Sequence, residues 1–361
     1  SDGSVFTPTS GTSNLRLGSG AGASIASGGN YNTVIGDSAG AGITTGDGNT
    51  GVGFNSLNAI TTGSLNTAVG NASLDASTTG ANNTAVGASA GTAVTTGVLN
   101  TFVGSNAGAA ATTADNNTAI GAYAFDAGTG GDNTAVGSGA LGGGSNTGTS
   151  NTAVGRDAGN SITSGTLNTL VGSLAGDALT DGEANVAIGY GALGAEDQAD
   201  ANVAIGVNTL ANQNAGTSES YNTAVGHNAG RQVTTGLRNT IIGGLAADAV
   251  TEGNNNVALG YNSLGADTKG SNSVAIGQGT LQAQNFTSAT NAYNVAVGHQ
   301  AGNLVTTGVR NTLIGGLSGD ALTDASSNVA IGYSSLTTNT RGSDNVAVGR
   351  GTLENFNVTS S

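Results

Sequence analysis

The chain has 361 residues, of which 64 are glycine and only one, Pro8, is proline, and it has no cysteine, methionine or tryptophan. This composition excludes an ordinary globular core, and the lack of a Gly-X-Y period excludes collagen. The formal net charge of −14 excludes nucleic acid and anionic membranes as direct partners, because there is no basic patch to displace counterions from phosphates. No apolar run approaches the roughly 18 residues of a membrane helix.

A short motif, Asn-Thr-Ala-Val-Gly or Asn-Val-Ala-Ile-Gly, dominates the chain. After a lead-in at residues 1–13 it recurs twenty times over residues 14–353, most often every 17 residues, and residues 354–361 form a C-terminal boundary segment. Fixed-period self-similarity is typical of a solenoid in which each repeat is one coil. The residues after each closing glycine recur every fourth coil, which predicts five four-coil units. Insertions of three or four residues, before Gly226 and Gly298, fall at unit boundaries.

Each motif alternates β-branched and small residues, which is the two-residue period of a strand. Both faces of the strand are apolar, as in parallel sheets covered on both sides, so the sequence predicts an all-β parallel β-solenoid. We predict that the β-branched residue before each closing glycine fills the inside of the coil, at Val69, Val86, Val103, Val154, Ile188 and Ile276.

The leading asparagine recurs at one place in nearly every coil. Asparagine side chains stacked at the strand spacing can hydrogen-bond up and down the column. We therefore predict a structural ladder that includes Asn66, Asn83 and Asn100.

The middle residue of the motif is usually alanine, but it is large in the second coil of each unit. If the neighbouring β-branched residue points inward, this residue points outward and another chain must cover it. The pattern thus predicts a homotrimer with subunit contacts at Phe102, Leu170, Ile241 and Leu313. The alternative is a monomeric coil that covers its own second face.

Few residues suggest a binding site. His227 and His299 are 72 residues apart, so they cannot share a metal ion within one chain. Asp181, Glu252 and Asp324 recur near one corner and raise a calcium hypothesis, although no Gly-Gly-x-Gly-x-Asp calcium repeat accompanies them.

A tyrosine recurs in the third coil of three units, at Tyr190, Tyr261 and Tyr333. These rings either pack against neighbouring loops or form a surface that binds sugar rings. No nucleophile elbow or phosphate loop is identified. We therefore expect a protein that is not an enzyme and needs no cofactor apart from the calcium hypothesis.

The run from Asn272 to Gly277, Asn-Ser-Val-Ala-Ile-Gly, resembles the head repeat of trimeric autotransporter adhesins. The Asn-Thr-Ala-Val-Gly motif with Ala-Gly and Thr-Thr-Gly resembles repeats of phage tail fibres and related surface proteins. The resemblance implies a left-handed β-roll that trimerises, with adhesion spread over its surface, although the 17-residue coil is longer than the usual head repeat.

The function expected from these features is an extracellular fibre at a cell surface or on a virion, adhesive or receptor-binding, with a surface glycan or protein as its receptor. The alternative is a filament subunit that stacks head to tail and has a purely mechanical role.

Overall fold

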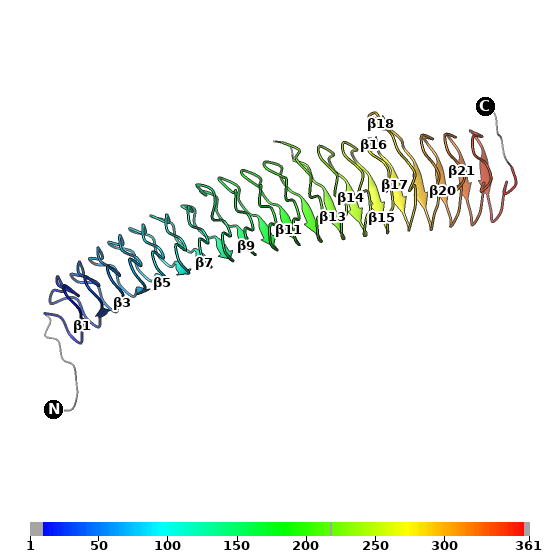
Figure 1. Cartoon of the computed structure of the whole chain (residues 1–361). Helices are drawn as coiled ribbons and strands as arrows, with labels where there is room; N and C mark the ends of the chain where they lie inside the picture. The colour runs from blue at the N-terminus through cyan, green and yellow to red at the C-terminus, as the bar shows by residue number, and fades with distance from the viewer. Residues whose placement is uncertain (1–9, 217–218, 357–361) are drawn as a thin grey trace. The chain divides into compact units, whose positions relative to one another are not determined.

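The computed structural model describes residues 10–216 and 219–356, and this described part is an all-β parallel β-solenoid without helices (Figure 1). The predicted solenoid of about twenty coils is confirmed. The chain divides into two compact units, Ser1–Asp181 and Gly182–Ser361. Part of the predicted lead-in (1–9) and of the C-terminal boundary segment (357–361) lies outside the described residues.

The first unit has ten coils, each with one three-residue strand that pairs in parallel with the strand of the next coil. Between β5 and β6, for example, Ala85 lies opposite Phe102 and Val86 opposite Val103, so equivalent residues stack. The strands are β1 (Leu15–Leu17), β2 (Thr33–Ile35), β3 (Thr50–Val52), β4 (Thr67–Val69), β5 (Thr84–Val86), β6 (Thr101–Val103), β7 (Thr118–Ile120), β8 (Thr134–Val136), β9 (Thr152–Val154) and β10 (Thr169–Val171).

The second unit repeats this arrangement with ten more coils. The two insertions add pairing at one corner: β16 with β18, and a single bridge between Asp200 and Glu219. The strands are β11 (Val186–Ile188), β12 (Val203–Ile205), β13 (Thr223–Val225), β14 (Thr240–Ile242), β15 (Val257–Leu259), β16 (Gly270–Ser271), β17 (Val274–Ile276), β18 (Thr290–Asn291), β19 (Val295–Val297), β20 (Thr312–Ile314), β21 (Val329–Ile331) and β22 (Val346–Val348).

Positions in a coil are numbered here from the leading asparagine, so that Asn83 is position 1 and Gly87 is position 5. The closing glycine at position 5 is required by both conformation and space. Gly87 has a φ of 139°, and a β-carbon on it would clash with the carbonyl oxygen of Gly104 in the next coil. The predicted corner with positive φ is therefore present.

The prediction of which strand face lies inside the coil is wrong. Position 3 is buried in every three-residue strand after β1, in both units. Position 4 faces outward. The residues predicted to fill the coil are 36 to 37% exposed at Val69, Val86, Val154 and Ile188, and half-buried at Val103 and Ile276. The predicted subunit contacts are instead core residues with 0% exposure: Phe102, Leu170, Ile241 and Leu313.

The physical reason is that a 17-residue coil has a narrow interior, which position 3 shares with positions 8, 9 and 12. A large residue at position 3 fits only where position 9 is small. Phe102 fills the space beside two position-9 glycines, Gly108 of its own coil and Gly91 of the preceding coil. A β-carbon on Gly91 would lie 2.9 Å from its ring, and one on Gly108 would clash with the ring. In the next coil, position 3 is Ala119 and position 9 is the buried Phe125. The four-coil period therefore reflects where a large side chain enters the interior, at position 3 in one coil and at position 9 in others.

The predicted asparagine ladder is present. Within the first unit the amide N–H of Asn100 donates to Oδ1 of Asn83 at 3.0 Å, and Asn83 repeats this with Asn66 at 3.0 Å. Each side chain also closes its own coil, since Nδ2 of Asn100 donates to the carbonyl of Ala114 at 2.8 Å. The ladder therefore satisfies buried backbone groups both along the stack and across each coil.

Candidate functional site

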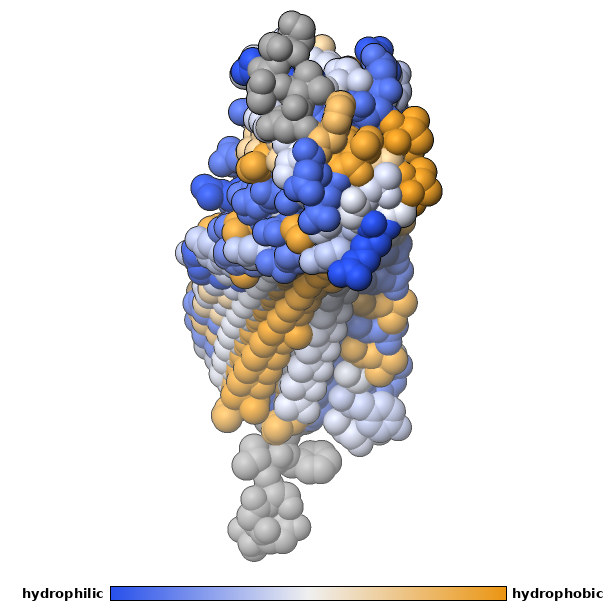
Figure 2. Space-filling view, turned by 90° about the vertical axis from the view of Figure 1, so that its right-hand side faces the viewer, coloured by the Kyte–Doolittle hydropathy of each residue, from blue (hydrophilic) through white to orange (hydrophobic). Residues whose placement is uncertain are grey.

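The outer face of the strands carries an exposed column of apolar side chains in each unit. Position 4 forms a column of valine, isoleucine and leucine with exposures of 36% or more at residues such as Val86 and Ile242, and position 2 beside it is threonine or valine after the first coil. Figure 2 shows apolar side chains gathered in a stripe along the stacked coils. Position 17 also carries exposed leucines in the first unit: Leu65, Leu99 and Leu167. Contiguous apolar surface of this kind marks an interaction site.

The three predicted surface tyrosines lie at position 6, just beyond the corner glycine. Tyr190, Tyr261 and Tyr333 are 53 to 55% exposed. Each is four coils from the next, about 19 Å at the spacing of stacked strands, so they do not form a continuous ladder. The other exposed tyrosines hold different positions in their coils, as Tyr123 does at position 7.

Two of these tyrosines pack beside a glycine of the preceding coil. A β-carbon on Gly244 would lie 3.6 Å from Cδ2 of Tyr261, and one on Gly316 would lie 3.5 Å from Cδ2 of Tyr333. The guanidinium of Arg350 lies 6.0 Å from the ring centroid of Tyr333. His227 and His299 belong to the same column, one coil before each glycine.

The three acidic residues of the calcium hypothesis form ion pairs with basic side chains or accept hydrogen bonds from hydroxyl groups. Glu252 forms an ion pair with Lys269 at 2.7 Å, and Asp324 lies 3.8 Å from Arg341. Asp181 accepts hydrogen bonds from Thr163 and Ser164, which lower the pKa of its carboxyl group. Within residues 10–216 and 219–356, no three His, Asp or Glu side chains gather as a metal site would require.

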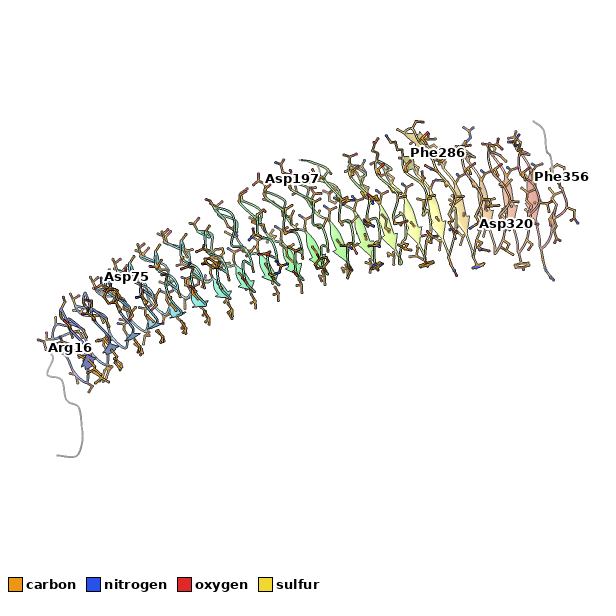
Figure 3. The ribbon with its side chains drawn as sticks, viewed as in Figure 1. Arg16, Asp75, Asp197, Phe286, Asp320 and Phe356 are labelled. Atoms are coloured by element: carbon orange, nitrogen blue, oxygen red, sulfur yellow. The ribbon has the colours of Figure 1, made fainter. Side chains whose placement is uncertain are left out.

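A buried acid and amide pair in the second unit was missed from the sequence. Asp267 and Gln284 both occupy position 12, where most coils have an aliphatic residue, and both are fully buried. Nε2 of Gln284 donates to Asp267 at 2.6 Å, and Oδ1 of Asp267 accepts the N–H groups of Gly270 and Phe286. Phe286 lies at the edge of the coil opposite the long column of strands, near the β16–β18 pair (Figure 3). The signal was available: two polar residues, one coil apart, in an apolar column.

Glu196 and Gln213 hold the equivalent positions at the other insertion. Oε1 of Glu196 accepts the N–H of Ala199 at 3.0 Å, and Gln213 donates to Ser220 at 2.9 Å. Burial raises the pKa of both carboxyl groups, Glu196 and Asp267. The effect is only partly opposed, by backbone hydrogen bonds at Glu196 and by the side chain of Gln284 and backbone hydrogen bonds at Asp267.

These raised pKa values predict an unusual response to acid. A carboxyl group whose pKa is higher in the folded chain binds more protons there than in the unfolded chain. The free energy of unfolding therefore decreases as pH rises through the pKa of the folded state. It increases as pH falls toward the pKa of the unfolded state. We expect the melting temperature to rise between about pH 7 and about pH 4. Asp267→Asn should flatten this slope. The exposed Asp37→Asn serves as the control, and a slope unchanged in Asp267→Asn would contradict the assignment.

Searches against models of known protein families and against curated proteins find no match for this chain. No helix in the described part of the chain is long and apolar enough to cross a membrane.

Proposed function

We propose that this chain is a non-enzymatic extracellular fibre, an adhesive or receptor-binding shaft at a cell surface or on a virion, built from three copies with left-handed coils. The observation that carries the proposal is the exposed β-branched column at position 4. In this proposal the three copies pack along that outer face, and not through Phe102 and its equivalents, which the coil interior already uses.

The chemistry of the face supports association with identical copies. The chain carries a net charge of −14, yet no charged residue occupies position 2 or position 4 in any coil. Like-charged copies can therefore approach along this face with little desolvation of charge. Each coil would add a small burial of apolar area at roughly 25 cal/mol per Å², and the same contact repeats in every coil of a stack. The trimeric number rests on the resemblance to adhesin head repeats.

The test is the mass of the chain in solution. We expect about 103 kDa, three times the chain mass of 34.3 kDa, by analytical ultracentrifugation. The variant Val86→Lys/Val154→Lys places two charges on the outer face and should give a monomer with an unchanged far-ultraviolet circular dichroism spectrum. Thr96→Lys, at an exposed site on another side of the coil, should remain trimeric. A wild-type chain that stays monomeric at every concentration would overturn the proposal.

A further inference from the structure

Position 6 of the second unit has an order of side chains that packing inside the coil does not explain. Three successive coils present histidine, glycine and tyrosine, first as His227, Gly244 and Tyr261, and again 72 residues later as His299, Gly316 and Tyr333. In the first unit this position holds mostly serine, alanine, aspartate and asparagine. The triplet is therefore a repeated feature of one part of the surface.

Each of these tyrosines presents an exposed ring at the surface, which we call a shelf, and the guanidinium of Arg350 lies over the Tyr333 ring at 6.0 Å from its centroid. The ring edge rests against the glycine of the preceding coil, at 3.6 Å for Tyr261 and 3.5 Å for Tyr333 from the place of the missing β-carbon. The rings nevertheless remain 55% and 54% exposed. Neither phenolic oxygen makes a hydrogen bond to the part of the chain that the structure describes. A β-carbon at either glycine would be in ordinary van der Waals contact with the ring edge, and a longer side chain would occupy the space beside the ring.

An exposed aromatic ring with a free hydroxyl suits one class of ligand best. The apolar C–H face of a pyranose stacks on such a ring, while its hydroxyl groups reach the phenol. The net charge of −14 repels sulfated and uronic acid polymers. We propose that the shelves at Tyr261 and Tyr333 bind neutral polysaccharide. This inference deepens the adhesive role proposed above and rests on it.

The spacing of the shelves favours a polymer over a free sugar. Four coils, or about 19 Å, separate two equivalent rings on one unit, so a single polysaccharide chain can occupy both. The second contact is then intramolecular, and the combined affinity exceeds that of one shelf. A monosaccharide gains nothing from the second ring.

The experiment measures binding of the full chain to soluble dextran, laminarin and yeast mannan, with heparin as the anionic comparison. Tyrosine fluorescence reports directly, because the chain contains seven tyrosines and no tryptophan. We expect at least one neutral polymer to bind and heparin not to bind. Tyr261→Ala or Tyr333→Ala should each weaken binding about three- to tenfold, and the double variant about a hundredfold.

Two controls separate a shelf from a nonspecific surface. Tyr123→Ala removes a tyrosine of similar exposure, 52%, outside the column and should leave binding unchanged. The variant Gly244→Gln/Gly316→Gln keeps both tyrosine rings but places a side chain beside each of them, and it should weaken binding. Equal binding by the double tyrosine variant, binding only to heparin, or no binding to any neutral polymer would overturn the proposal. The mass of the same samples is measured in parallel, so a trimer that binds no sugar refutes the shelves and leaves the fibre standing.

Discussion

Replacing Phe102 with alanine is expected to lower the free energy of unfolding by about 3–5 kcal/mol. The ring is fully buried and fills the space beside Gly91 and Gly108. Its removal leaves a cavity that the stacked coils cannot close, because the backbone hydrogen bonds to the coils on either side fix the spacing. Denaturation with guanidinium chloride, followed by circular dichroism, measures the loss.

A second substitution tests whether the four-coil period reflects where a large side chain enters the interior. Leucine at position 9 adopts the left-handed conformation that Gly108 has, as at Leu74 with a φ of 48°. The double variant Phe102→Ala/Gly108→Leu converts the coil to the pattern of other coils and should recover part of the lost stability, whereas Gly108→Leu alone should be destabilising. If Phe102 lay instead at a subunit contact, Phe102→Ala would reduce the oligomer mass and leave the stability of the monomer unchanged.

The number, register and parallel pairing of the coils could be predicted from the sequence, because a constant period places equivalent residues opposite each other. Thr67 stacks on Thr84 and Val69 on Val86 for this reason alone. The asparagine ladder followed from the same logic, since a polar side chain that recurs at one place in each coil has its own copies as nearest partners.

The orientation of the strand could not be predicted from alternation, because both faces are apolar and a period of two does not say which face is inside. The larger residue, as at Val69, was assigned to the interior, as it would be in a wide core. The information that decides the question is a correlation: Phe102 occurs with Gly108, and Ala119 with Phe125. No coil has a large side chain at both position 3 and position 9, which is expected when both side chains share one interior.

The candidate surfaces depended on this orientation. Once position 4 faces outward, the apolar column becomes the proposed contact between copies, and the tyrosines beyond the corner glycine become separate features. The tyrosines could be identified from their recurrence. Gly244 and Gly316 could not, because each of these glycines is 17 residues away in the sequence from the ring that packs beside it. Sequence proximity carries no information about contacts between neighbouring coils.

The asparagine ladder gives the second large expected effect. Asn100→Ala should lower the free energy of unfolding by about 2–6 kcal/mol, because it leaves the buried N–H of Asn117 and the carbonyl of Ala114 without their partners, and each such group costs about 1–3 kcal/mol. Asn100→Asp keeps the acceptor for Asn117 but loses the donor and buries a charge, so it should not restore stability at neutral pH. Asn71→Ala, at an exposed site, is the matched control and should change stability by less than about 0.5 kcal/mol. Equal losses at Asn71 and Asn100 would show that the column contributes no more than any surface amide.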